Sequence, residues 1–388
     1  MTITFGSIPQ MAKNNKVNKH IRKTFASRQI DFQSTQLLKI DTVSFSGKQP
    51  SFKSIIDTER LPLPLDQAKT TEDFVNKMKE TIKGSQWVKI NNIRLTDIAA
   101  LFKEPPNLLD WKGYISDEAF NAVPPDLNRA MFELAINIAN QSGFIIEEPE
   151  GKAKKWEIGG SGAKAMVDVI SKIREENILP GINLKNPSEV SEKISPLLKD
   201  VPFKEDRIAI FKEFAQSGAY KKIENILNQA KTGSNSYCFT FDSVKKLAEA
   251  FPKSFGNDPF YKKASLVMIA MAGFSRPRGI DIQLDVPVAS DYRLPQTLEG
   301  LGILHFNDDL NNALQEGKIF HEDHPAVQHI RAASVVASAE ISKQTGFDSA
   351  MIDGLLWGMA RKLSKLEPAP GTTKYDPKPH IMVSTMRF

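Results

Sequence analysis

The sequence predicts a mainly helical protein with, at most, a small sheet. From about Thr71 onward, apolar residues recur at helical spacing between Pro and Gly residues, while the alternating pattern of strands is scarce. A hydrophobic fraction of 41% is enough to bury a core. The 388 residues allow two or three domains, or one large domain with an appendage.

The first 70 residues form the predicted appendage. Between Lys13 and Arg60, Lys and Arg are scattered among Ser, Gln and Asn, and few apolar residues recur at a steady period. Such a segment does not easily offset the entropy lost on ordering. We predict that residues 1–70 are a basic, flexible extension. It serves most simply as a solubilising segment or linker, and recruitment to an acidic partner is the alternative.

Three helices can be placed in order along the chain. The first has an apolar stripe that ends near Pro252, formed by Val244, Leu247, Ala248 and Phe251. Pro325 suits the first turn of the second, whose apolar face holds Ile330, Ala333, Ala337 and Ile341. Asp348 is expected to cap the third, with Ile352, Leu355, Leu356, Met359 and Leu363 on its buried side. The modest strand candidates are Trp87 to Ile93 and Lys154 to Ile158.

Charge and cysteine content narrow the function classes. The formal net charge of +5 is spread along the chain, so it permits a phosphate-bearing ligand without requiring nucleic acid. Cys238 is the single cysteine, which excludes an internal disulfide and a multi-cysteine zinc site. No apolar run approaches the roughly 20 residues of a membrane helix, and the start of the chain lacks a signal pattern. We therefore expect a soluble, cytoplasmic protein.

The segment from Ser290 to Gln296 is the strongest candidate site. It places an acid, an aromatic ring, a guanidinium and an amide within seven residues: Ser-Asp-Tyr-Arg-Leu-Pro-Gln. Each buried polar group needs its own partner, so this composition suits a site better than a core. His321, His324 and His329 include an H-x-x-H spacing, but Pro325 interrupts it, and we read these residues as loop histidines near a helix cap rather than metal ligands.

A family resemblance follows from four motifs taken in order. They are Asp258-Pro259-Phe260-Tyr261-Lys262-Lys263-Ala264, Asp291-Tyr292-Arg293-Leu294-Pro295-Gln296, Ile330-Arg331-Ala332, and Asp353 with Leu356-Trp357. Their order and spacing resemble the queuosine salvage proteins, which are queuosine 5′-phosphate N-glycosylases, and the chain is identified as a divergent member. Asn137 lies in a looser matching segment, and the resemblance extends from about Asp110 to Leu366.

The resemblance implies a fold and an activity. The fold is a helical domain similar to the helix-hairpin-helix DNA glycosylases, spanning residues 71–366, followed by a C-terminal tail at residues 367–388. The activity is hydrolysis of the bond between a 7-deazaguanine base and ribose 5′-phosphate, which releases queuine for reinsertion into transfer RNA. The implied partner is a small nucleotide, not a membrane or a nucleic acid, and no metal or organic cofactor is implied.

The chemistry of this reaction needs a carboxylate. Breaking an N-glycosidic bond builds positive charge on the anomeric carbon and ring oxygen of the sugar, and a fixed carboxylate stabilises that charge. We expect the carboxylate to act through space, through a covalent link to the sugar or by orienting water. Asp291 is the candidate catalytic residue, with Asp285 and Asp353 in reserve. The alternative is that Asp291 only caps a helix or pairs with Arg293.

Cationic residues are expected at the phosphate. Lys262 and Lys263 are candidates to neutralise the 5′-phosphate, and Arg331 is a third cation for the same group. Arg293 is expected either to bind phosphate or to hold the aspartate ionised. A plain surface position is the alternative for each lysine.

The remaining candidates are expected to contact the base. Gln296 offers both a donor and an acceptor to a base edge. Tyr292 suits stacking or core packing equally. Asp353 and Trp357 lie four positions apart, on one helical face, and join an acid to a ring that also suits the core.

Two departures from the family pattern bear on substrate preference. Ile138-Ala139-Asn140-Gln141 replaces an aromatic-rich run, and Val327 and His329 stand where acidic side chains are usual. These changes keep two alternatives open. One is a catalytically weakened protein of the same fold that binds a nucleotide or base, and the other is a nucleic-acid glycosylase or binder that uses the basic extension.

Overall fold

The computed structural model of the chain describes residues 68–102, 126–147, 153–156, 162–175, 187–363 and 381–388. All of them belong to one compact unit, Val43–Phe388. The predicted extension lies outside the described residues up to residue 67.

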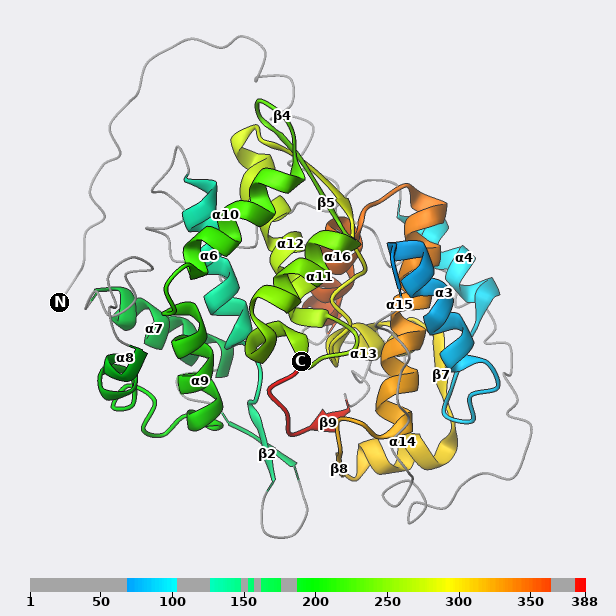
Figure 1. Cartoon of the computed structure of the whole chain (residues 1–388). Coiled ribbons are helices and arrows are strands. Elements are labelled where there is room, and N and C mark those ends of the chain that lie inside the picture. Colours follow the sequence, from blue (N-terminus) through cyan, green and yellow to red (C-terminus); the bar gives the residue numbers. More distant parts are fainter. Residues whose placement is uncertain (1–67, 103–125, 148–152, 157–161, 176–186, 364–380) are drawn as a thin grey trace, which may run out of the picture. The chain divides into compact units, whose positions relative to one another are not determined.

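The described residues are mainly helical, as the sequence predicts (Figure 1). The α-helices are α3 (Thr71–Ile82), α4 (Asn92–Leu101), α6 (Leu127–Ala139), α7 (Gly162–Glu175), α8 (Pro187–Ile194), α9 (Lys204–Phe214), α10 (Ala219–Ala230), α11 (Phe241–Ala250), α12 (Lys262–Ser275), α13 (Arg293–Gly300), α14 (Asp308–Gln315), α15 (Pro325–Thr345) and α16 (Ser349–Leu363). Two short helices, η3 (Pro252–Gly256) and η4 (Arg276–Arg278), follow α11 and α12. Within the described residues, no helix has the length and apolar character that crossing a membrane requires.

The strands form small sheets. They are β1 (Val88–Ile90), β2 (Ile145–Glu147), β3 (Ala153–Lys155), β4 (Lys231–Gly233), β5 (Ser236–Thr240), β6 (Asp281–Asp285), β7 (Leu304–Phe306), β8 (Ile319–Phe320) and β9 (Met382–Val383). Strands β4, β5 and β6 make the three-stranded sheet, in which β5 and β6 are parallel. The pairs β1 with β7 and β2 with β3 are antiparallel, and β8 with β9 is parallel.

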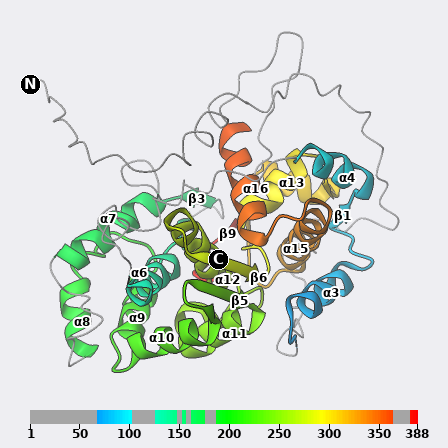
Figure 2. The same cartoon turned by 90° about the horizontal axis from the view of Figure 1, so that it is seen from above.

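Helix α12 is the central element of the core. Every one of its residues is buried, which is typical of a helix that is covered on all sides. It contacts α6, α11 and α16, as can be followed in Figures 1 and 2. Its first residue is Lys262, and the preceding Tyr261 has a left-handed backbone with φ 52°. A buried helix that begins with a lysine brings a charge to the interior.

The three helices placed from sequence are confirmed. Helix α11 ends at Ala250, two residues before Pro252, and α15 begins at Pro325. Asp348 Oδ1 accepts a hydrogen bond of 3.0 Å from the backbone N–H of Met351 at the start of α16. His324 caps α15, because its Nδ1 accepts a hydrogen bond of 3.1 Å from the N–H of Ala326.

The two strand candidates are confirmed over part of their length. In the first, only Val88–Ile90 is strand, because the side chain of Asn91 accepts a hydrogen bond from the N–H of Arg94 and starts α4. The second overlaps β3 (Ala153–Lys155) at Lys154 and Lys155, while residues 157 and 158 lie outside the described residues.

Candidate active site

Asp291 lies at the first turn of α13, where its two carboxylate oxygens have different surroundings. Oδ1 accepts hydrogen bonds from the backbone N–H groups of Arg293 at 2.7 Å and Leu294 at 3.4 Å. Oδ2 lies 3.9 Å from Nζ of Lys262, and the Asp291 side chain is 14% exposed. The helix-capping role weighed from the sequence is therefore present. It occupies one oxygen and leaves the other facing a cation.

Lys262 is a buried cation that the start of α12 directs toward Asp291. Its side chain is only 6% exposed. Its backbone N–H donates a hydrogen bond of 2.9 Å to Oδ2 of Asp258, which fixes the first turn of the helix. An ammonium this well buried needs a negative partner, and Asp291 supplies one.

Asp353 adds a second carboxyl group to this cluster from α16. Burial, and after it the negative charge of Asp291, raises the pKa of Asp353 from 3.8 to about 8, against the opposing effects of Lys262 and the backbone N–H of Ala289. Oδ1 of Asp353 has no hydrogen-bond partner among the described residues. Asp353 is thus mainly protonated at neutral pH and has one oxygen uncommitted.

The pair of carboxyl groups is suited to acid chemistry combined with charge stabilisation. Helix α16 contacts both α12 and α13, so it brings Asp353 to the two elements that carry Lys262 and Asp291. A protonated carboxyl next to a carboxylate allows one group to donate a proton while the other stabilises a cation. We call Asp291, Lys262 and Asp353 the carboxyl cluster.

Arg331 connects the segments that precede Asp291 and Lys262 through its hydrogen bonds to Ser290 and Asp258. Its Nη1 donates a hydrogen bond to Oδ1 of Asp258, and its Nη2 donates one to Oδ2, both at 2.8 Å. Its Nε donates a hydrogen bond of 2.9 Å to the carbonyl of Ser290, and the Ser290 hydroxyl donates one of 3.0 Å back to the carbonyl of Arg331. This network ties the residue before Asp291 to the segment before Lys262. Arg331, predicted from sequence as a phosphate ligand, is engaged in structural contacts.

Lys263 is also engaged away from the carboxyl cluster. Its amine donates hydrogen bonds to the carbonyl of Ala139, at 2.6 Å, and to the carbonyl of Met386. Burial is the main reason that the pKa of Lys263 lies well below its usual value, followed by the charges of Lys262 and Arg207. Adjacent lysines therefore have different surroundings. Lys262 faces Asp291, whereas Lys263 joins α6 to the end of the described chain.

Tyr292 lines a small cavity next to Asp291. The cavity has a volume of about 30 Å³ and is otherwise lined by Gln141, Ser142, Gly143, Phe144, Ile145, Ile381, Val383 and Phe388. Burial is the main cause that raises the pKa of the Tyr292 phenol, so the phenol stays neutral. The Arg293 guanidinium carbon lies 5.5 Å from the centre of the Tyr292 ring, and Arg293 Nη1 donates a hydrogen bond of 3.0 Å to Oε1 of Gln296.

Three further candidates lie at other positions. Asn137 is buried in α6, where its side-chain oxygen accepts a hydrogen bond of 2.8 Å from Gln141. Asp285 is exposed at the end of β6, and its carbonyl accepts a hydrogen bond of 2.6 Å from the hydroxyl of Thr71. Trp357 is half-buried on α16, one turn after Asp353.

The structure adds aromatic residues that sequence reasoning missed. In the segment after Asn137, only Gln141 lines the cavity, while Ile138 and Ala139 are fully buried in the core. Phe144 and Phe388 line the cavity instead. No pattern in the sequence points to Phe144 or Phe388, because neither lies in a cluster of aromatic residues.

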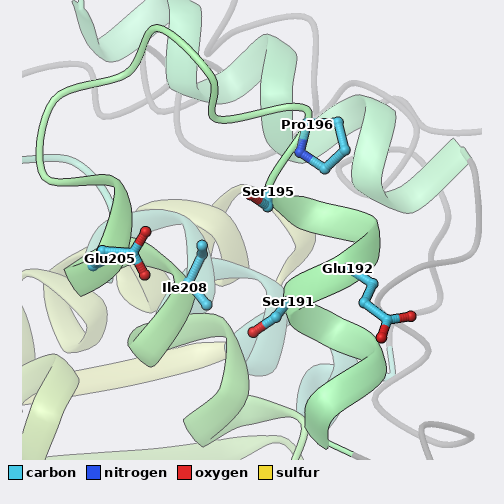
Figure 3. A pocket seen from close by; sticks show the side chains of 6 residues that line it. All are labelled: Ser191, Glu192, Ser195, Pro196, Glu205 and Ile208. Carbon is cyan, nitrogen blue, oxygen red and sulfur yellow. The ribbon is translucent and has the colours of Figure 1, made fainter.

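A second hollow lies on the surface between α8 and α9 (Figure 3). Two glutamates and two serines line it with Pro196 and Ile208, and none of the predicted site residues is among them. It therefore offers no cation for a phosphate and no ring for a base.

Residues 194–375 match a family model described as queuosine salvage protein. A search of curated proteins found no match. The matched region contains all three members of the carboxyl cluster, and the match confirms the resemblance predicted from the motifs. It supports a role in queuosine salvage and a small-molecule substrate.

Proposed function

We propose that this chain, similar over residues 194–375 to the queuosine salvage proteins, hydrolyses the base–ribose bond of queuosine 5′-phosphate or a related 7-deazaguanine nucleotide. The observation that carries this proposal is the carboxyl cluster, in which Lys262 lies 3.9 Å from Asp291 and the buried Asp353 has a pKa raised by burial and by the charge of Asp291. The product is the free base, available for salvage.

Asp291 stabilises the sugar as the bond breaks. The electron pair of the glycosidic bond leaves with the base, and positive charge grows on the anomeric carbon and the ring oxygen. The carboxylate is already oriented by two backbone N–H groups, so no reorganisation is needed when the charge appears. Oδ2 is the oxygen that faces the sugar, because Oδ1 is held by the first turn of α13.

Asp353 supplies the proton that the departing base needs. A 7-deazapurine has carbon in place of the most basic ring nitrogen of a purine, so protonation must occur elsewhere on the base. Asp353 transfers its proton to the base and becomes a carboxylate. Water then adds to the anomeric carbon and returns a proton to Asp353, which restores the starting state. The overall reaction consumes one water and gives one base and one ribose 5-phosphate.

Lys262 is the cation proposed for the 5′-phosphate. Of the cations predicted for that role, Lys263 and Arg331 are engaged with buried backbone and carboxylate oxygens. Lys262 faces Asp291 at a longer distance, 3.9 Å, which leaves its donors available to an anion. The same charge also balances Asp291 before the substrate arrives.

The direct test is release of free base. Purified protein is incubated with queuosine 5′-phosphate, and queuine and ribose 5-phosphate are followed by chromatography. Equal amounts of the two products are expected from wild type, and none from protein inactivated by heat. Absence of both products, at protein concentrations near that of the substrate, would refute the hydrolase.

A binding protein of the same fold is the second candidate. The helix-capping contacts of Asp291 favour it, because hydrogen bonds from the N–H groups of Arg293 and Leu294 give this carboxylate a structural role that requires no turnover. Saturable binding of queuosine 5′-phosphate without product release would support this reading over hydrolysis.

A further inference from the structure

The segment Ile381–Phe388, which we call the tail segment, is docked on the fold. Its strand β9 pairs in parallel with β8, with Met382 beside Ile319 and Val383 beside Phe320, and it can be followed in red in Figure 1. Arg387 then makes ion pairs with Glu322 and Asp323, at 2.9 and 2.6 Å. Both contacts fall on the stretch that joins β8 to α15.

The tail segment contacts Arg331, the residue that connects the segments preceding Asp291 and Lys262. The guanidinium carbon of Arg331 lies 3.9 Å from the centre of the Phe388 ring and 4.2 Å from that of Phe260. The ring of Phe388 thus covers one face of the guanidinium that binds Asp258. Phe388 is 5% exposed, so this contact is a buried one.

Residues of the main fold are fitted to the tail segment. The carbonyl of Met386 accepts hydrogen bonds from the hydroxyl of Ser142 and the amine of Lys263. The Lys263 amine therefore connects the carbonyl of Ala139, at the end of α6, to the carbonyl of Met386 in the tail segment. Gly143 has φ +72°, and an added Cβ would lie 2.5 Å from the Met386 sulfur. A side chain at position 143 would therefore require the Met386 side chain to move and would be strained by the positive φ.

The tail segment supplies one wall of the cavity beside Tyr292. Ile381, Val383 and Phe388 line it, and Met382, between them on the strand, does not. Phe144 and Ile145 face them from the main fold. The cavity therefore has apolar and aromatic side chains on the tail-segment side, and it also has polar lining residues, Gln141, Ser142 and Tyr292. Tyr292 is the neighbour of Asp291 in the chain. A flat heterocycle suits the apolar side, and a sugar suits the charged side.

We propose that the tail segment is the base-side wall of the nucleotide pocket and that Phe388 is a specificity-determining residue that takes the face of the base. This inference rests on the proposed function. Because the cavity of about 30 Å³ holds about one water, it must enlarge when a base enters. The wall lies outside residues 194–375, the part of the chain that matches the family model.

The test compares two probes in Phe388→Ala. Calorimetry measures the affinity of the full-length protein for free queuine and, separately, for ribose 5-phosphate. Loss of base stacking is expected to weaken queuine binding about tenfold or more, while affinity for ribose 5-phosphate is unchanged. With the nucleotide, KM rises by a similar factor. Phe388→Tyr keeps the ring and is expected to restore queuine binding.

Met382→Ala is the matched control, because it shortens a side chain of the same strand that does not line the cavity. It is expected to leave both affinities unchanged. Val383→Ala is a milder second change within the wall, and it is expected to weaken queuine binding by less than Phe388→Ala. Thermal unfolding of each variant establishes that the comparison is made between folded proteins.

Several results would contradict the proposal that the tail segment is the base-side wall of the pocket. Unchanged queuine affinity in Phe388→Ala and Val383→Ala is one, and tighter binding, which would make the tail segment a plug, is another. An equal loss for queuine and ribose 5-phosphate would make Phe388 a structural residue. Failure of wild type to bind queuine would also overturn it. If wild type binds queuine through Phe388 but releases no base from the nucleotide, the proposed hydrolysis is refuted and the proposed base-side wall is supported.

Discussion

Arg331 and Asp258 form a buried, bidentate ion pair in which both distances are 2.8 Å. Each side chain is 3% exposed. The pair joins α15 to the segment that starts α12, and through Nε of Arg331 it also fixes the carbonyl of Ser290, the residue before Asp291. The relative position of Asp291 and Lys262 therefore depends on a contact that involves neither of them.

Removal of either partner should destabilise the whole protein. Asp258→Asn leaves the buried guanidinium without a counter-charge, and the expected loss is about 3–5 kcal/mol of unfolding free energy. Arg331→Lys keeps the charge but lacks the planar fork, so it should also lower stability. Chemical denaturation measures both. If Arg331 instead binds the phosphate, Arg331→Lys should raise KM for the nucleotide and leave the unfolding free energy unchanged.

Asp291→Asn should keep the fold and lose turnover. An asparagine oxygen still accepts the hydrogen bonds from Arg293 and Leu294 and so caps α13. The lost negative charge should lower kcat by about 100- to 1,000-fold. Asp285→Asn is a suitable control, because Asp285 is exposed at the end of β6. Wild-type kcat in Asp291→Asn would remove this residue from the mechanism.

The two adjacent lysines should give different phenotypes. Lys262→Ala should lower kcat/KM for queuosine 5′-phosphate much more than kcat/KM for unphosphorylated queuosine, because a charge that contacts the phosphate is lost. Steady-state kinetics with both substrates make this comparison. An equal loss of kcat/KM for the two substrates would mean that Lys262 acts only through Asp291 and does not contact the phosphate.

Lys263→Met provides the contrasting case. It leaves the carbonyl of Ala139 without this donor, and a buried unsatisfied acceptor costs about 1–3 kcal/mol. The carbonyl of Met386 loses one of its two donors and keeps the hydrogen bond from the Ser142 hydroxyl. We expect a lower unfolding temperature and no preference between the phosphorylated and unphosphorylated substrates. A selective loss for the phosphorylated substrate would return Lys263 to the phosphate site.

The sequence predicted what depends on local patterns. The spacing of apolar residues placed α11, α15 and α16, and the concentration of polar groups from Ser290 to Gln296 marked the segment that holds Asp291. Asp353 was selected as a reserve carboxylate from a motif on α16. Its buried position gives it the raised pKa that makes it an acid.

The roles of the cations depend on contacts between distant residues. Arg331 is 73 positions from Asp258, and Lys263 is 123 positions from Met386, so no local pattern distinguishes these two from Lys262. The two-residue strand β9 is also too short to give a periodic signal. For the same reason Phe388 could not be connected with Tyr292 before the fold was known.

Asp353 should give the protein a characteristic pH dependence of stability. Its pKa is about 8 in the folded protein against 3.8 as a free group, so between these values the folded state binds one proton more than the unfolded state. The unfolding free energy should then fall as pH rises through this window, by about 1.4 kcal/mol per pH unit from this group alone. Above pH about 8 this contribution to the slope ends, because both states have lost the proton.

Asp353→Asn isolates this contribution, because the amide does not titrate. The difference in unfolding free energy, wild type minus Asp353→Asn, should decrease steadily from pH 5 to pH 8 in urea denaturation. In kinetics, kcat of wild type should fall as pH passes about 8, since the proton donor is lost. Below pH about 8, Asp353→Asn should be slower than wild type by about 100- to 10,000-fold, and this difference should narrow at higher pH. A stability difference that is independent of pH would mean that Asp353 is ionised in the folded protein, and a charged Asp353 has no proton to give to the leaving base.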